Sequence, residues 1–174
     1  MPARRILQLG DPLLRAVSVP AAPSPETDAV FEDLRDTLAE FRRVHGFGRG
    51  ISAVQIGVAK RLIYIEIDGR AYRLRNPEYV SQSAGKFRLW DDCFSFPHLM
   101  VWVERSEKVQ VRYRDESDRE QLIEASGPFS ELLQHEMDHL EGILAIDRAL
   151  DQNSLATREE WKRRCAGGST AVGA

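Results

Sequence analysis

The sequence has few cysteines, and it has no long hydrophobic run. Two cysteines, Cys93 and Cys165, are too few for a disulfide framework, which favours a reducing cytosol. No window approaches the roughly 18 consecutive apolar residues of a membrane span. No hydrophobic segment follows Met1–Arg5, as a secretory signal would require. We therefore expect a cytoplasmic protein with no membrane partner.

An excess of charge of either sign is also lacking. The chain has 24 Lys and Arg residues against 27 Asp and Glu, and it contains no basic block, so we expect no nucleic acid partner. With 43% hydrophobic and 29% charged residues, the composition is that of a globular protein. The length of 174 residues suits one domain, because a chain of about 150 residues buries about 70% of its unfolded surface.

One stretch carries a His-Glu-x-x-His pattern, formed by His135, Glu136 and His139. It lies in a predicted amphipathic helix that Gly127-Pro128 opens and Gly142 ends. At roughly 100° per residue, one helical face offers both imidazoles and the carboxylate. Two histidines one turn apart can share a divalent ion, and the glutamate can accept a proton from a bound water. A chance pair of histidines is the alternative, but buried polar groups need partners, which favours a metal.

The sequence leaves the third metal ligand open. Glu159 stands twenty residues after His139, as a thermolysin-like site requires, but little predicts the second long helix that would bring it back. A metzincin-like site is excluded, because Ala145 stands where a third histidine is needed. Cys93 would give two histidines and one thiolate with an open fourth position, although many free cysteines are only small buried hydrophobes. The chemistry favours Cys93 over Glu159.

The remaining sequence predicts one further long helix and several strands. The helix covers residues 25–44, between Ser24-Pro25 and Gly46. Strands are expected at residues 61–67, 71–75, 100–103, 109–113 and 120–123. Asp68-Gly69 joins the first two in a hairpin, and Asn76-Pro77 ends the second. The glycine-rich stretch 46–57 would let the backbone approach a ligand closely, but it lacks the features of a nucleotide-binding loop.

Three segments together resemble the peptide deformylase family. Residues 48–55 (Gly-Arg-Gly-Ile-Ser-Ala-Val-Gln) are similar to its Gly-x-Gly-x-Ala-Ala-x-Gln segment. Residues 91–95 (Asp-Asp-Cys-Phe-Ser) are similar to its Glu-Gly-Cys-Leu-Ser segment, and residues 134–142 to its His-Glu-x-x-His helix. The order and spacing agree. The resemblance implies a catalytic domain over residues 1–150. For the extension over 151–174, the residues themselves predict a short helix at 157–164 and then a disordered tail, because the segment from Ala166 has low complexity.

This resemblance implies a fold, a reaction and a set of site residues. The fold is α+β, with small antiparallel sheets packed around the central motif helix. The reaction is removal of the N-formyl group from the terminal methionine of newly made peptides, including nascent chains at the ribosome, with release of formate. The cofactor is one divalent ion, Fe²⁺ in preference to Zn²⁺, Ni²⁺ or Co²⁺. The implied residues are Cys93, His135 and His139 as ligands, Glu136 as general base, and Gln55 and the Phe94 backbone N–H as donors to the oxyanion.

The sequence departs from the family pattern near the expected substrate. Asp91 and Asp92 stand where the family has Glu and Gly, Ser52 and Val54 where it has Ala and Pro, and Met100 where many members have a peptide-binding Arg. Arg49 replaces an apolar residue at the edge of the methionine pocket, so it either turns outward or makes that pocket polar. Arg49, Gly50 and Asp91 are the candidate substrate-binding residues.

The departures keep other functions open. They are a related hydrolase for another formamide or amide, a thermolysin-like peptidase that uses Glu159, and a non-catalytic binding protein that retains the fold. Arg105 aligns with the family's partner for the glutamate at position 91, so we expect an ion pair between Asp91 and Arg105. The sequence does not indicate an oligomeric state.

Overall fold

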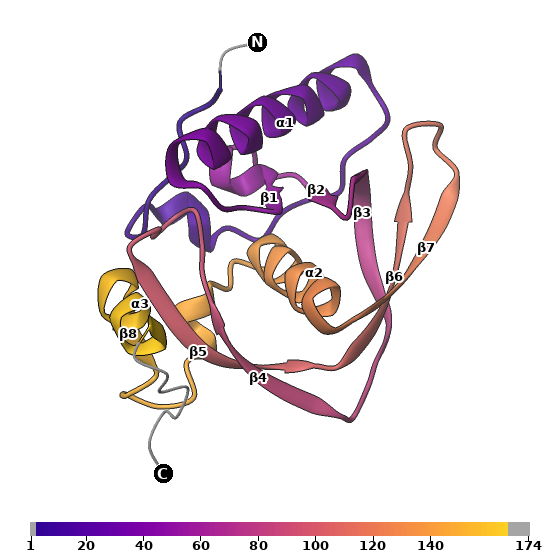
Figure 1. Cartoon of the computed structure of the whole chain (residues 1–174). Coiled ribbons are helices and arrows are strands. Elements are labelled where there is room, and N and C mark those ends of the chain that lie inside the picture. Colours follow the sequence, from indigo (N-terminus) through magenta and orange to yellow (C-terminus); the bar gives the residue numbers. More distant parts are fainter. Residues whose placement is uncertain (1–2, 167–174) are drawn as a thin grey trace.

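Helix α2 (Gly127–Leu140) carries the His-Glu-x-x-His motif and lies at the centre of the molecule, and two strands of the larger sheet separate it from helix α1 (Pro25–His45) (Figure 1). The structure is a computed structural model that describes residues 3–166. Every side chain of α2 from Ser130 to Leu140 is buried. Its polar side chains must therefore find their partners inside the protein.

Two antiparallel sheets surround α2. The larger sheet has the strand order β1-β2-β3-β6-β7, and the smaller has the order β4-β5-β8. The strands are β1 (Gly50–Ser52), β2 (Leu62–Ile67), β3 (Arg70–Gln82), β4 (Lys86–Asp91), β5 (Leu99–Ser106), β6 (Lys108–Arg114), β7 (Glu120–Ser126) and β8 (Leu155–Thr157). Short 3₁₀ helices are η1 (Pro12–Arg15), η2 (Ala53–Ile56) and η3 (Ala145–Arg148). The predicted α+β fold class is confirmed.

Local signals set the bounds of the two long helices. The Ser24 side chain accepts a hydrogen bond from the Thr27 N–H at the start of α1, and Gly46 ends that helix with φ 78°. Gly142 follows the end of α2 with φ 70°, as predicted. The apolar face of α1 packs into the core with Phe94, the residue after Cys93. Helix α1 thus supports the loop that carries the candidate thiolate ligand.

The prediction that Asn76-Pro77 ends a strand is wrong, because β3 continues through both residues to Gln82. Asn76 has φ 51°, and the register of β3 against β6 shifts between Arg75 and Glu78. This bulge accommodates the missing N–H of proline. The Asn76 side chain accepts from the Ala21 N–H (2.8 Å) and donates to the Ala21 carbonyl (2.9 Å), which stabilises the unusual backbone.

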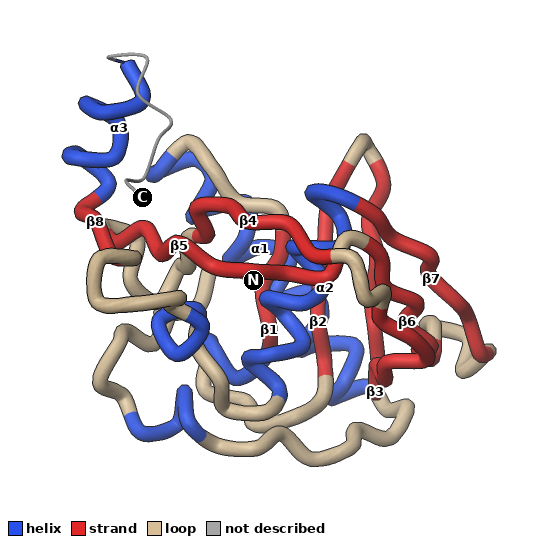
Figure 2. Tube along the Cα trace, turned by 90° about the horizontal axis from the view of Figure 1, so that it is seen from below, coloured by secondary structure: helices blue, strands red, loops and turns tan. Residues whose placement is uncertain are grey.

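The C-terminal segment adds a strand and a helix beside the smaller sheet. Strand β8 pairs with β5, and α3 (Arg158–Ala166) follows it directly. Figure 2 shows β8 and α3 at one end of the β4–β5 pair, with β6 and β7 at the other. Cys165 is exposed, and the predicted tail beyond residue 166 lies outside the described residues. Within residues 3–166, no helix is long and apolar enough to cross a membrane.

Candidate metal centre

The side chains of Cys93, His135 and His139 meet in the interior, and all three are buried. His139 Nε2 lies 3.3 Å from Cys93 Sγ and 3.2 Å from His135 Nε2. In a tetrahedral site with Zn–N bonds of about 2.0 Å and Zn–S bonds of about 2.3 Å, neighbouring donors are about 3.3–3.6 Å apart. The three donors therefore fit one divalent ion. Glu159 is exposed on α3 and is not part of this cluster.

A buried carboxylate holds the His135 ring from behind. Asp91 Oδ1 lies 2.9 Å from His135 Nδ1, and Asp91 Oδ2 accepts a hydrogen bond of 2.9 Å from Arg105 Nη2. Burial opposes the charged form, but the His135 and Arg105 charges outweigh it and hold the pKa of Asp91 well below its usual range. A carboxylate on Nδ1 fixes the ring so that Nε2 faces the other ligands.

This geometry separates two expectations for Asp91. The ion pair with Arg105 is present, and both side chains are almost fully buried. Asp91 was also a candidate substrate-binding residue, but it lies behind His135 and does not line the adjoining cavity. Its contacts are those of a residue that orients the candidate metal ligand His135.

The Glu136 carboxylate lies beside the ligands and is in contact with strand β1. Ser52 Oγ donates a hydrogen bond of 2.6 Å to Glu136 Oε2. Gly50 approaches so closely that a Cβ there would lie 3.0 Å from Glu136 Oε1. Burial raises the pKa of Glu136 to about 7, although the His135 charge and the Ser52 hydrogen bond oppose the rise. A carboxyl group with such a pKa can both accept and return a proton at neutral pH.

Gln55 and Phe94 lie next to Cys93, the candidate third ligand. The Gln55 Oε1 atom accepts from the Ser52 N–H (3.0 Å), and this contact directs Nε2 toward Cys93 Sγ (3.6 Å) and Ser95 Oγ (3.3 Å). The Phe94 ring stacks on Phe41 at 3.8 Å between centroids. Both residues are therefore held firmly next to the candidate metal ligands.

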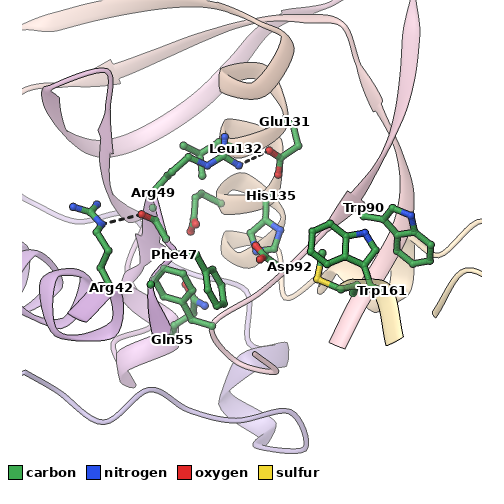
Figure 3. Close-up of a pocket in the computed structure, with 16 residues that line it drawn as sticks. Arg42, Phe47, Arg49, Gln55, Trp90, Asp92, Glu131, Leu132, His135 and Trp161 are labelled. Carbon is green, nitrogen blue, oxygen red and sulfur yellow. Dashed lines mark hydrogen bonds and ion pairs between the residues drawn. The ribbon is translucent and has the colours of Figure 1, made fainter. Parts of the chain in front are cut away.

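A cavity of ≈ 500 Å³ opens beside His135, one of the three candidate ligands (Figure 3). Gln55, His135 and Glu136 contribute to its lining. On one side, Arg49 Nη2 forms an ion pair of 2.7 Å with Glu131 Oε2, and Arg49 Nη1 donates to the Pro128 carbonyl (3.1 Å). The Arg49 side chain is 41% exposed, whereas that of Glu131 is 5% exposed. Arg49 therefore lies along the cavity wall with its charge neutralised by Glu131. It is partly turned outward to solvent, and it also makes the wall polar, so both expectations for it apply in part.

Sequence reasoning missed two residues of this wall. Glu131 lies one helical turn before His135, so the i, i+4 spacing could have placed it on the same face. Burial, together with the nearby Asp91 charge, raises the pKa of Glu131, and Arg49 opposes this rise. Trp161 of α3 also lines the cavity, and no short-range pattern connects it to the motif helix.

The fold and the candidate ligand set are those of an α+β metal hydrolase of the His-Glu-x-x-His type, in which Cys93 would be the third ligand. Comparison with known proteins narrows the class. The sequence matches the polypeptide deformylase family over residues 3–154. The peptide deformylase of Bartonella tribocorum is 34% identical over 154 residues, which is 84% of each chain. The chain therefore belongs to the polypeptide deformylase family.

Solved structures agree with this assignment. The structure of a peptide deformylase from Synechococcus elongatus in complex with actinonin has a TM-score of 0.81 and 29% identity, and the match covers 99% of this chain and 89% of that one. The Met-Ala-Ser-bound class I type b peptide deformylase from Acinetobacter baumannii has a TM-score of 0.76 and 25% identity, with 84% and 98% covered. As a member of this family, the chain is a metal-dependent hydrolase.

The buried ion pair of Arg105 with Asp91 predicts that replacing Arg105 destabilises the protein far more than replacing Arg88, an arginine of the same sheet. Arg105→Met should lower the free energy of unfolding by about 3–5 kcal/mol, because Asp91 and Asp138 would lose a buried partner. Arg88→Met is the control, since Arg88 pairs with Glu104 across β4 and β5 in an exposed position. Its effect should stay below about 1 kcal/mol. Equal losses in urea denaturation of the two variants would contradict this account.

The ligand set predicts which residue the metal requires. Protein purified anaerobically should contain one divalent ion per chain by elemental analysis, and Cys93→Ala should lose most of it. Glu159→Ala should keep its metal, because Glu159 is exposed on α3. The reverse pattern would show that the third ligand is the glutamate.

Proposed function

We propose that this site removes the N-formyl group from the terminal methionine of newly made peptides and releases formate. The observation that carries the proposal is the convergence of Cys93, His135 and His139 on one point, with the Glu136 carboxylate beside them at the wall of a cavity. Membership of the family supports it. The Met-Ala-Ser ligand of the Acinetobacter baumannii relative has the sequence of a deformylated peptide. The proposed location is the cytoplasm, where nascent chains leave the ribosome.

The three ligands select the chemistry of the cofactor. An ion held by Cys93, His135 and His139 would supply a nucleophilic hydroxide at neutral pH and would polarise the formyl carbonyl. We propose Fe²⁺ for this site. One thiolate and two imidazoles also suit Zn²⁺, Ni²⁺ or Co²⁺.

The chain's own residues handle the proton and the developing charge. Glu136 takes the proton of the attacking water and delivers it to the peptide nitrogen as the C–N bond breaks, so that water and formamide give formate and a free amine. The Gln55 Nε2–H₂ group and the Phe94 backbone N–H donate to the carbonyl oxygen as it becomes negative. One such donor is worth about 3 kcal/mol in the transition state. The Ser52 N–H holds the Gln55 amide in the required orientation.

The function is tested by formate release from formyl-Met-Ala-Ser with the metal content measured on the same sample. Glu136→Gln should keep the fold and the metal yet lose about 10²- to 10⁴-fold in turnover, because an amide cannot accept the proton. Glu141→Gln, at the exposed end of the same helix, is the matched control and should retain activity. Turnover of Glu136→Gln near that of the wild type would remove Glu136 from the mechanism.

The Arg49–Glu131 pair predicts a shifted substrate preference. An apolar methionine side chain that packs against this wall removes water from two charged groups, which weakens binding. The double variant Arg49→Val/Glu131→Leu should therefore raise kcat/KM for formyl-Met and formyl-Leu peptides several-fold relative to a formyl-Glu peptide.

The single variant Arg49→Val distinguishes the effect of losing one charge from the effect of losing the whole ion pair. Arg49→Val leaves Glu131 as a buried charge without its partner, and it should disfavour the formyl-Glu peptide most strongly. If the three substrates keep the same proportions in both variants, the pair does not set specificity.

A further inference from the structure

Trp161 reaches the cavity from a part of the chain that the catalytic motifs do not include. It lies on α3, after the last motif residue in the sequence, yet it lines the same cavity as Gln55, His135 and Glu136. Figure 3 shows its indole between His135 and Trp90, across the cavity from Phe47. The C-terminal helix therefore forms part of the wall opposite the glycine-rich loop.

Arg158, the first residue of α3, fastens this helix to the loop that carries Cys93. Its Nη2 atom donates to Asp92 Oδ2 (2.6 Å), its Nε to the Pro97 carbonyl (2.7 Å), and its backbone N–H to the His98 carbonyl (2.8 Å). The guanidinium also lies 3.9 Å from the centroid of the Phe47 ring. A planar guanidinium with a carboxylate, a carbonyl and an aromatic face as partners is fixed in one orientation.

This anchor explains a departure from the family pattern. Asp92 stands where the family has glycine, next to the candidate ligand Cys93. Its carboxylate pairs with Arg158 and also lines the cavity. The altered motif residue thus connects α3 to the metal centre.

Trp161 offers two kinds of contact to a peptide. Its ring supplies an aromatic surface, and its Nε1–H is buried without a hydrogen-bond partner in the described part of the chain. Indole Nε1–H is a donor only, and a buried donor without an acceptor is destabilising. Met100 lines the same cavity and supplies no such donor. Because protein atoms enclose this N–H of Trp161, a peptide carbonyl of the substrate would reach it only after a rotation of the indole.

We propose that Trp161 binds the part of the substrate peptide that follows its first residue, and that Arg158 and Asp92 hold it in place. This inference rests on the proposed deformylase function and adds a subsite to it. The occupant is the peptide backbone of the second and third residues. Trp161 is then a substrate-binding residue, and Arg158 and Asp92 are positioning residues.

The test compares a short and a long substrate, formyl-methionine amide and formyl-Met-Ala-Ser. Trp161→Ala should lower kcat/KM for the tripeptide about 10- to 100-fold, chiefly through KM, and should change the value for the short substrate less than about 2-fold. Trp161→Phe keeps an aromatic ring without the donor and should lie between Trp161→Ala and the wild type. Lys162→Ala, the exposed neighbour on α3, is the control and should match the wild type.

The positioning role of Arg158 and Asp92 is tested in the same assay. Arg158→Met and Asp92→Asn should lower kcat/KM for formyl-Met-Ala-Ser but not for formyl-methionine amide. The loss should be smaller than in Trp161→Ala, because these variants make the indole more mobile without removing it. If the role of Trp161 were purely structural, its replacement would lower kcat/KM for both substrates by the same factor. Equal losses for the two substrates, or no loss for either, would overturn the proposal.

Equilibrium binding separates this proposal from the proposed function. Calorimetric titration with the tripeptide Met-Ala-Ser should show weaker binding to Trp161→Ala than to the wild type, and thermal unfolding confirms that the variant is folded. If the wild type releases no formate from either substrate, the proposed reaction fails, and weaker binding to Trp161→Ala would still support the peptide subsite. Equal binding to both proteins, or none to the wild type, would refute the subsite.

Discussion

The buried pair between Asp91 and Arg105 is the constraint on which the site depends. It joins the end of β4 to β5, and Asp91 also holds the Nδ1 edge of His135 on α2. Cys93 follows two residues later in the chain, so the same carboxylate sets the position of the thiol relative to the imidazoles. A charge inside the protein is tolerated only with such partners. The metal centre and the junction of sheet and helix are therefore one structure.

The unusual motif residues have partners elsewhere in the chain. Arg49 pairs with Glu131, Asp92 with Arg158, and Asp91 with Arg105. Random loss of a catalytic site would leave altered residues without such partners. Here the changes are compensated, and the ligands and Glu136 remain in place, which favours a working hydrolase with a modified substrate wall over a binding protein that only retains the fold.

Short-range patterns predicted those parts of the fold whose causes are local. Ser24, Pro25 and Gly46 bound α1, and the spacing of His135 and His139 on one helix face predicted that they would meet. Ligand chemistry favoured Cys93 over Glu159 as the third ligand and the family resemblance implied it, but short-range patterns alone could not place Cys93 beside the histidines, because that depends on how a strand packs on a helix. Tertiary contacts also explain two of the failures. Ala21 stabilises the bulge at Asn76, and the pairing of β8 with β5, together with the Arg158 contacts, brings Trp161 to the cavity.

The glycines of the glycine-rich loop allow the close backbone approach that was expected, but the groups approached are protein side chains. They were expected to let the backbone approach a ligand, and the close approach is instead to the side chains of Glu136 and Phe94. A Cβ on Gly50 would meet the Glu136 carboxylate, and one on Gly48 would lie 2.5 Å from the Phe94 ring. Since Gly50 also pairs with Ile65 in the larger sheet, the position of β1 determines how much space Glu136 has. The sheet therefore positions the Glu136 carboxylate directly, through backbone contact.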